Sequence, residues 1–315
     1  MVKKNEVGQS GLIANIERYA LNDGLGVRTT IFLKGCPLRC RWCCNPETQE
    51  YNQELVFFAE QCIGCGSCIG DCPYGALADS SNPDYHICRK CYQRESKFAC
   101  VTGCCTQCKK IAGEEYTIAR LLEVARRDMN FYLKSGGGVT ISGGEPLAQP
   151  RFLENILKAF HENWIDTAIE TCGMGKQEDY ERIAPYLNMI FFDLKSLDDL
   201  KNKAWTGSDT RIIRENFIRV AQLIQEYQFE LIVRTPVIPG FNDQDEDIRK
   251  ICDFIKETGA EISGYELLPY HKLGRSKYQS LGRQYSLEEL EPPTKEQMER
   301  LYWRVDSYGI PVYSF

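Results

Sequence analysis

After about residue 116, the hydrophobic residues of the chain follow two alternating patterns. In the first pattern they lie three and four positions apart, which is typical of helices that bury one face. This pattern predicts helices at 118–125, 152–160, 217–227 and 248–255. In the second pattern they form short apolar runs, which are typical of buried strands. Strands are therefore predicted at 139–142, 167–170, 189–193, 231–235 and 265–268, with an earlier one at 29–33.

Helices and strands that alternate in this way are typical of βα units arranged around a parallel sheet. We therefore expect an α/β fold with a barrel-like sheet. A last helix is predicted at 295–307, where Thr294 and Gln297 have the spacing of a capping box.

Residues 54–112 interrupt the alternation. They are rich in cysteine, glycine and polar residues and show no sustained periodicity, so a bound metal rather than an apolar core must organise them. The sequence thus predicts an α/β domain in two parts, 1–53 and 113–315, that is interrupted by an insert at 54–112.

The composition agrees with this organisation, because 315 residues with 43% hydrophobic side chains can bury one large core. No apolar run approaches the roughly 18 residues that a membrane-spanning helix needs. The opening residues, MVKKN, lack the apolar core of a signal peptide, so we expect a cytoplasmic protein that does not bind membranes. A net charge of -6 gives no general attraction to phosphate backbones, and nucleic acid is not an expected partner.

The chain contains 16 cysteines, and all of them except Cys172 and Cys252 lie between Cys36 and Cys108. Thiols stay reduced in the cytoplasm, so a dense group of cysteines there points to metal ligation rather than to disulfides. The two isolated cysteines are predicted to be packing residues.

The first cysteine motif is Cys36-Pro-Leu-Arg-Cys40-Arg-Trp-Cys43, on a loop after a predicted strand. Three thiolates bind three irons of a cubane cluster and leave the fourth iron open, which allows chemistry on a ligand. A zinc site that uses Cys44 or a distant residue as its fourth ligand is the alternative. An electron carrier fits this motif poorly, since a carrier needs every iron closed.

The insert contains a second motif, Cys62-x2-Cys65-x2-Cys68-x3-Cys72-Pro73, which is the cysteine run of bacterial ferredoxins. In ferredoxins with two clusters, the fourth cysteine of such a run binds the other cluster, so a second set is expected downstream. That set is Cys88-x2-Cys91-x8-Cys100-x3-Cys104.

The two sets predict cross-ligation. One cluster would take Cys62, Cys65, Cys68 and Cys104, and the other Cys72, Cys88, Cys91 and Cys100. Cys105 and Cys108 are spare or alternative ligands, between which the spacing does not choose. A mononuclear zinc insert is the alternative.

The Cys36 motif, with an aromatic residue before its last cysteine, resembles the radical S-adenosylmethionine (SAM) superfamily. Within it, the segments DGLGVRT at 23–29 and CRWCCNPE at 40–47 resemble the activating enzymes of glycyl radical enzymes. Leu25 and Cys44 depart from the usual pattern, where proline and histidine are common. The resemblance implies a partial (βα)6 barrel of the radical SAM type with a small ferredoxin-like insert.

The resemblance also implies the residues of the site. Cys36, Cys40 and Cys43 would hold the catalytic 4Fe-4S cluster, and the segment SGGEP at 142–146 resembles the site for the methionine amino group of the cofactor. Lys195 and Arg234 would balance the cofactor carboxylate. Asp23 and Lys195 would join the three cysteines in catalysis. The expected cofactor-binding and cation-contacting residues are Trp42, Cys43, Cys44, Gly143, Gly144, Glu145, Glu170, Thr171, Asp193, Leu194, Lys195, Arg234 and His271.

The function that the resemblance implies is reductive cleavage of SAM at the catalytic cluster. The 5'-deoxyadenosyl radical would then generate a glycyl radical on a partner glycyl radical enzyme. It further implies three 4Fe-4S clusters, a monovalent cation, a low-potential electron donor such as flavodoxin or ferredoxin, and a monomeric protein. A radical SAM enzyme that acts on a small molecule or another peptide is the alternative.

Overall fold

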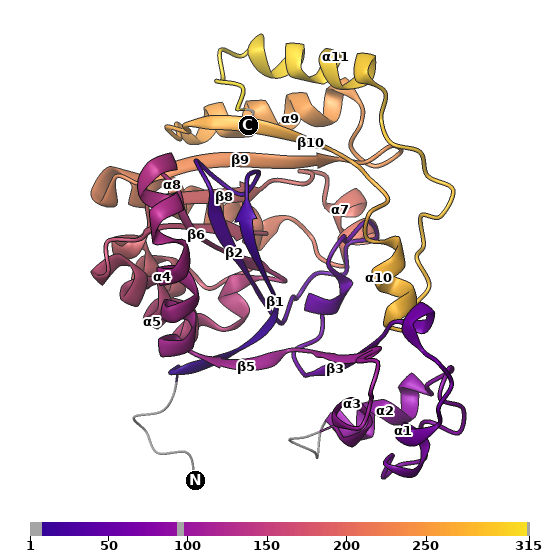
Figure 1. Ribbon diagram of the computed structural model, residues 1–315. Helices are drawn as coiled ribbons and strands as arrows, with labels where there is room; N and C mark the ends of the chain where they lie inside the picture. Colours follow the sequence, from indigo (N-terminus) through magenta and orange to yellow (C-terminus); the bar gives the residue numbers. More distant parts are fainter. Residues whose placement is uncertain (1–7, 93–97, 314–315) are drawn as a thin grey trace.

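The computed structural model describes residues 8–92 and 98–313. Its largest feature is an eight-stranded sheet with the strand order β10-β9-β8-β7-β6-β2-β1-β5 (Figure 1). The strands are β1 (Ser10–Ala20), β2 (Arg28–Leu33), β5 (Glu114–Thr117), β6 (Gly138–Gly143), β7 (Asp166–Thr171), β8 (Met189–Asp193), β9 (Glu230–Val237) and β10 (Gly264–Pro269).

From β2 to β10, every pair of neighbouring strands in this sheet is parallel. Helices connect successive strands, so the sheet is the predicted partial barrel, and each predicted strand lies within an observed one. Because the strands are parallel, their carboxyl ends share one rim, where α/β folds place ligands.

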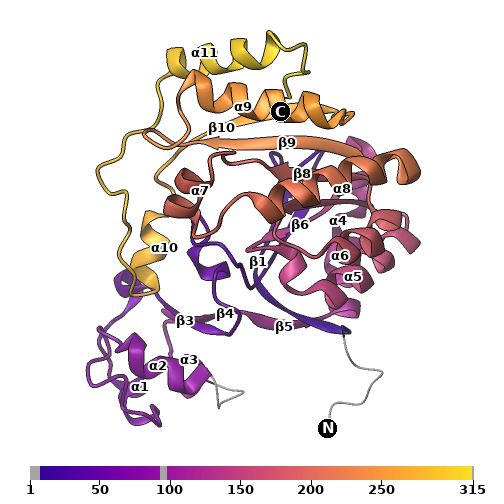
Figure 2. The same ribbon diagram turned by 180° about the vertical axis from the view of Figure 1, so that it is seen from behind.

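Most of the larger helices lie on the outer side of the sheet, whereas α10 (Arg275–Ser280) lies beside the insert (Figures 1 and 2). The others are α4 (Ile118–Ser135), α5 (Pro150–Glu162), α6 (Gln177–Ile183), α7 (Asp199–Thr206), α8 (Arg211–Tyr227), α9 (Asp245–Thr258) and α11 (Lys295–Asp306). The capping box at Thr294 and Gln297 is present, with both of its hydrogen bonds. None of the helices in the described ranges is long and apolar enough to cross a membrane.

The strands are apolar on both faces because both faces are buried. Ile169 and Phe192 contribute to the main core beneath the outer helices. Ala168 and Phe191, one position away on the same strands, belong to a separate cluster on the opposite face. Side chains alternate along a strand, so burial of both faces requires the short continuous apolar runs seen in the sequence.

The antiparallel edge of the sheet was not predicted. Strand β1 pairs with β2 on one side and with β5 on the other. Only the first part of β1 alternates between buried and less buried positions, and β5 has no buried residue. Ile13 of β1 lies in the main core and Tyr116 of β5 packs against it, but backbone pairing contributes most of what holds these two strands in the sheet.

The insert is a small unit on a two-stranded stem, in which β3 (Glu54–Phe57) pairs with β4 (Lys109–Ala112). Between the two strands, the described residues form three short α-helices, α1 (Ser67–Gly70), α2 (Tyr85–Tyr92) and α3 (Ala99–Thr102). Both views show the insert beside α10 and away from the helices that cover the sheet.

Contacts of two kinds between described residues attach the insert to the barrel. The Tyr85 hydroxyl donates a hydrogen bond of 2.9 Å to the carbonyl of Ser280, at the end of α10. At the base of the stem, Glu54 pairs with the buried Lys34 at 2.8 Å and with Arg283. The insert is therefore fixed against the loop that follows β2 and against the segment that contains α10.

Candidate active site and cysteine groups

A cavity of about 400 Å³ lies at the carboxyl ends of the parallel strands. It brings together residues from the loop after β2 and from the ends of β6, β7, β8, β9 and β10. The predicted site residues that line it are Cys36, Cys40, Trp42, Cys43, Cys44, Gly143, Gly144, Glu170, Thr171, Asp193, Lys195, Arg234 and His271.

The loop that holds the first cysteine motif is fixed by its backbone. The amide of Cys36 donates to the carbonyl of Gln49 at 3.1 Å, and that of Arg39 donates to the carbonyl of Thr206 at 2.7 Å. The first bond closes the loop on itself, and the second ties it to the end of α7. The motif has no regular secondary structure, so these bonds set the directions of its side chains.

Aromatic packing supports the same loop from the side. The ring of Trp42 lies 5.0 Å from that of Phe241 and 6.4 Å from that of Trp205. The aromatic residue between the second and third cysteines of the motif therefore anchors the loop as well as lining the cavity.

The thiols of this motif are suited to metal ligation. Burial raises the pKa of Cys40 to about 12 and raises that of Cys43 well above its usual range. Thiolates at these positions therefore need a nearby positive charge. Bound metal supplies that charge and displaces the protons. Together with Cys36, these two cysteines give one short loop three thiols with a cavity beside them, which fits a 4Fe-4S cluster with one open iron.

The two glycines of the SGG turn are required for close backbone packing. A Cβ atom on Gly143, which has a φ of 118°, would lie 2.3 Å from backbone atoms of Leu33. One on Gly144 would lie 2.3 Å from the carbonyl oxygen of Gly35. From the sequence, these glycines were expected to let backbone groups approach a ligand. In the structure they also let the turn pack against the base of the cysteine loop.

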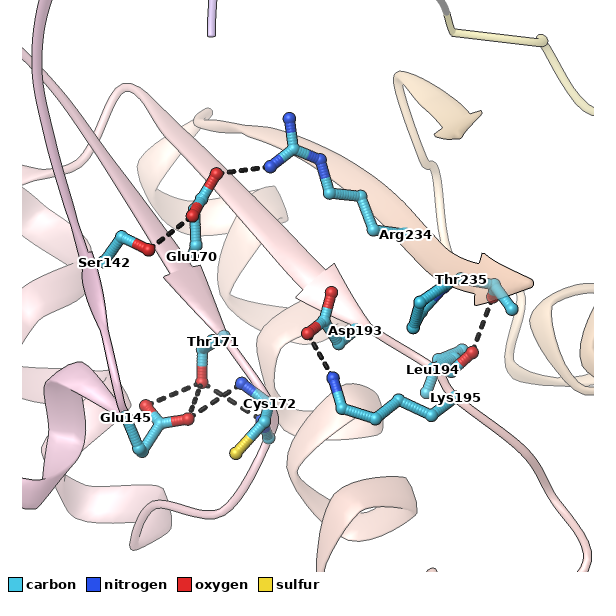
Figure 3. A network of polar contacts seen from close by, with 12 residues as sticks. Ser142, Glu145, Glu170, Thr171, Cys172, Asp193, Leu194, Lys195, Arg234 and Thr235 are labelled. Carbon is cyan, nitrogen blue, oxygen red and sulfur yellow. Dashed lines mark hydrogen bonds and ion pairs between the residues drawn. The ribbon is translucent and has the colours of Figure 1, made fainter. Parts of the chain in front are cut away.

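Glu170 and Arg234 form the central ion pair of the cavity (Figure 3). The Ser142 hydroxyl donates to the other oxygen of the Glu170 carboxylate. Arg234 also donates to Glu266 at 2.6 Å and lies 3.6 Å above the ring of Phe191. Burial raises the pKa of Glu170 and that of Glu266, while Arg234 acts in the opposite direction on both.

A second ion pair joins Lys195 to Asp193 at the end of β8 (Figure 3). Burial lowers the pKa of Lys195, but the Asp193 carboxylate and the Cys40 thiol outweigh this effect and raise the pKa above its ordinary value. Lys195 therefore carries a positive charge beside the cysteine loop. Such a charge favours both thiolates and an anionic group of a ligand.

Three predicted site residues do not line the cavity. Leu194 is fully buried in the main core, and only its backbone joins the strand ends, where its amide donates to the carbonyl of Arg234 at 2.9 Å. Asp23 accepts a hydrogen bond from the Thr30 hydroxyl at 2.5 Å. Glu145 is completely buried.

Glu145 supports the cavity wall from behind. Its carboxylate accepts hydrogen bonds from the Thr171 hydroxyl at 2.9 Å and from the Cys172 amide at 2.8 Å. It also accepts one from the amide of Leu147 at 3.1 Å. Burial raises its pKa, and these donors oppose that shift. Glu145 thus joins the turn after β6 to the end of β7.

Cys172 was predicted to be a packing residue, but it lies in the cavity wall. Its thiol forms a hydrogen bond with that of Cys36, and this bond lowers the pKa of Cys36. The packing role fits Cys252, which is fully buried in the main core. The signal that could have identified Cys172 is its position directly after Glu170 and Thr171 at a strand end.

In the insert, the cysteines gather into two groups, each around a small cavity. The first cavity is lined by Cys62, Cys65, Cys68, Cys104 and Cys108. The second is lined by Cys72, Cys88, Cys91 and Cys100. Each cavity thus combines cysteines from both sequence motifs, in the groups that cross-ligation predicts.

Burial affects the thiols of the second group. Burial raises the pKa of Cys88 to about 12 and that of Cys100 to about 11, so thiolates there need a compensating positive charge. The amide of Ala76 points at the sulfur of Cys72, at 3.2 Å. Hydrogen bonds to cysteine sulfur are among the features that set the potential of an iron–sulfur cluster.

Comparison with known families supports iron–sulfur chemistry at the Cys36 loop and in the insert. The radical SAM superfamily matches residues 85–255. A 4Fe-4S binding domain matches residues 55–78, and a 4Fe-4S single cluster domain matches residues 22–65.

Several proteins are similar along most of the chain. The indoleacetate decarboxylase activating enzyme of Tractidigestivibacter scatoligenes is 37% identical, over 98% of each chain. The isethionate sulfite-lyase activating enzyme of Oleidesulfovibrio alaskensis is 40% identical, over 89% of this chain and 90% of its own. Among solved structures, a domain of a pyruvate-formate lyase-activating enzyme from Bacteroides vulgatus is 27% identical, with a TM-score of 0.47. It covers 56% of this chain and 98% of that domain.

Proposed function

The chain belongs to the radical SAM superfamily and, within it, to the activating enzymes of glycyl radical enzymes, and we propose residue roles for this activity. When bound, the 4Fe-4S cluster supplies the electron that splits SAM into methionine and the 5'-deoxyadenosyl radical, which generates the glycyl radical on the partner protein. The observation that carries the proposed roles is the convergence of three spaced cysteines, Lys195 and Arg234 on one cavity.

In our proposal, Cys36, Cys40 and Cys43 hold the catalytic cluster. Lys195 and Arg234 provide positive charge for the carboxylate of SAM, and Gly143 and Gly144 present backbone groups to its amino group. Glu170 pairs with Arg234 and Asp193 with Lys195, and the carboxylate oxygen atoms of both can bind a monovalent cation. Glu145 is a positioning residue, because its carboxylate holds the backbone at Cys172 without lining the cavity.

We further propose that the insert holds two 4Fe-4S clusters, which makes three in the whole chain. The two separate cysteine groups support this number. A low-potential donor such as flavodoxin or ferredoxin would reduce the insert, and the insert would pass electrons to the catalytic cluster. We propose that the enzyme works as a monomer in the cytoplasm.

Formation of a glycyl radical tests whether the substrate of the enzyme is a glycyl radical enzyme. Reconstituted enzyme, SAM and a reductant are mixed with the glycyl radical enzyme of the same organism. We expect the glycyl radical doublet in the electron paramagnetic resonance (EPR) spectrum, together with faster formation of 5'-deoxyadenosine. The matched control is the partner with its radical glycine replaced by alanine, which should give no doublet. Cleavage of SAM that no glycyl radical enzyme accelerates would instead favour a small-molecule or other peptide substrate.

Iron content tests the number of clusters. Replacing Cys65 and Cys91 together with Ala removes one ligand from each insert cluster. The iron content should fall from about twelve to about four per chain. SAM binding to the remaining cluster should persist, provided that circular dichroism shows an intact α/β core. Cys105→Ala, which changes an exposed thiol of the same insert, should keep the full iron content. An unchanged iron content in the double variant would contradict the ligand assignment.

A further inference from the structure

The end of the cysteine loop is held by a distant part of the chain. The loop runs directly into the segment NPE at 45–47. Lys277, on α10, donates hydrogen bonds to the side chain of Asn45 at 2.6 Å and to that of Glu47 at 2.8 Å. These partners lie 232 and 230 positions earlier in the chain. One ammonium group therefore ties both ends of the segment to α10.

The start of α10 also packs tightly against the loop. Gly274 directly precedes this helix. A Cβ atom on Gly274 would lie 2.7 Å from the Cα atom of Cys44 and 3.1 Å from the carbonyl oxygen of Cys43, so only glycine fits there without a shift. The backbone bonds described above hold the beginning and the middle of the loop. The contacts with α10 hold its end.

Two other cations contact the same segment, but they also hold the insert. Lys34 and Arg283 each donate to a backbone carbonyl of the segment, at 2.7 and 2.6 Å, and each pairs with Glu54 of the insert stem. Replacing either of them would disturb the stem and the segment together. Within the described residues, the ammonium of Lys277 bonds to side chains of the segment alone. Lys277 is therefore the cation whose removal tests the segment by itself.

We propose that Lys277 is a positioning residue for the cleavage of SAM. It holds the segment 45–47 and thereby fixes Cys43 and Cys44, the part of the loop that lines the cavity next to this segment. Lys277 does not line the cavity, so it acts through the segment. This inference rests on the proposed activity and on the proposed ligands of the catalytic cluster. Reacting groups must be held to a fraction of an ångström, and a misplacement of about 1 Å can cost about a hundredfold in rate.

The test compares variants of the full-length reconstituted enzyme. Lys277→Ala should keep its iron, because the three spaced cysteines remain. The amides of Thr48 and Gln49 bond to carbonyls of the segment at 3.0 and 3.2 Å. In this variant they should exchange with deuterium about tenfold faster, since a charged hydrogen bond that holds the segment is lost. With dithionite as reductant, kcat for formation of 5'-deoxyadenosine should fall about tenfold while KM for SAM stays near that of the wild type.

Three further variants separate the roles of packing and charge. Lys277→Arg keeps a cationic donor and should restore both the exchange rates and kcat. Gly274→Ala keeps the lysine but forces α10 away from the loop, so it should reproduce both effects of Lys277→Ala. The matched control is Arg275→Ala, which removes a cation of the same helix that pairs with Glu288. It should change neither the exchange rates nor kcat.

Unchanged exchange at Thr48 and Gln49 in Lys277→Ala would overturn the inference, as would a normal kcat or a loss of iron. Faster exchange throughout the protein would also overturn it, because Lys277 would then stabilise the whole fold rather than this segment. These results leave the proposed activity standing. If the wild type itself formed no 5'-deoxyadenosine, the proposed activity would fail and the inference with it, so the two failures are distinguishable.

Discussion

Cys40→Ala is expected to abolish the formation of 5'-deoxyadenosine from SAM. Cys40 is a central residue of the cysteine loop, and its thiol lies close enough to Lys195 for each to shift the pKa of the other. Two remaining thiolates cannot hold three irons, so the cluster with an open iron does not assemble. Chromatography of the reaction products measures the loss, and iron analysis should show about four irons fewer per chain.

The matched control for this prediction is Cys44→Ala. Cys44 is the next residue to Cys43 and lines the same cavity. Its removal should leave the cluster assembled, because the three spaced cysteines already complete the ligand set. Cleavage retained by Cys40→Ala would refute the ligand set. A lost cluster signal in Cys44→Ala would show that Cys44 is a ligand.

Arg234→Ala is expected to destabilise the fold by about 3–5 kcal/mol, the usual cost of leaving a buried charge without its partner. Glu170 and Glu266 both pair with Arg234, and the side chain of Arg234 is only 6% exposed. Urea denaturation measures the change in the free energy of unfolding. The same variant should bind SAM more weakly, since it removes a positive charge from the cavity.

The cost of Arg234→Ala should also depend on pH. Burial raises the pKa of Glu170 and of Glu266, and removal of Arg234 takes away the cation that opposes this shift. When the pKa of a carboxyl group is raised in the folded state, the free energy of unfolding of the protein decreases as the pH rises through that pKa. The free energy of unfolding of the variant should therefore be closest to that of the wild type near pH 5, and the difference should be largest near pH 8.

Arg249→Ala is the matched control for the second prediction. Arg249 also pairs with two carboxylates, those of Glu246 and Asp253, but its side chain is 43% exposed. Exposed ion pairs contribute at most about 1 kcal/mol, so this variant should remain close to the wild type at every pH. If both variants lost the same free energy of unfolding, burial would not explain the expected cost of Arg234→Ala.

Much of the α/β domain could be predicted because its signals are local. The predicted strand at 189–193 coincides with β8, and the helix predicted at 118–125 is the first part of α4. Both depend on the spacing of apolar residues within one segment, which reports the face that is buried. Strand β5 gave no such signal, since none of its residues is buried. It joins the sheet through backbone pairing with β1.

By itself, the sequence determined the chemistry of the protein. Cysteine spacing such as that of Cys36, Cys40 and Cys43 is set by ligand geometry over a few residues, so it can be recognised without a fold. The family relationship extends beyond these segments, because the similarity covers most of the chain.

Only the tertiary structure decided which side chains meet. It placed Cys172 against Cys36, and it brought the sulfur of Cys108 to 3.3 Å from that of Cys104 while it left Cys105 exposed. It also paired Arg234 with Glu266, two residues that face each other in register on β9 and β10. Such contacts depend on strand register and loop anchoring. These are set by packing across the whole domain, so no short segment of the sequence encodes them.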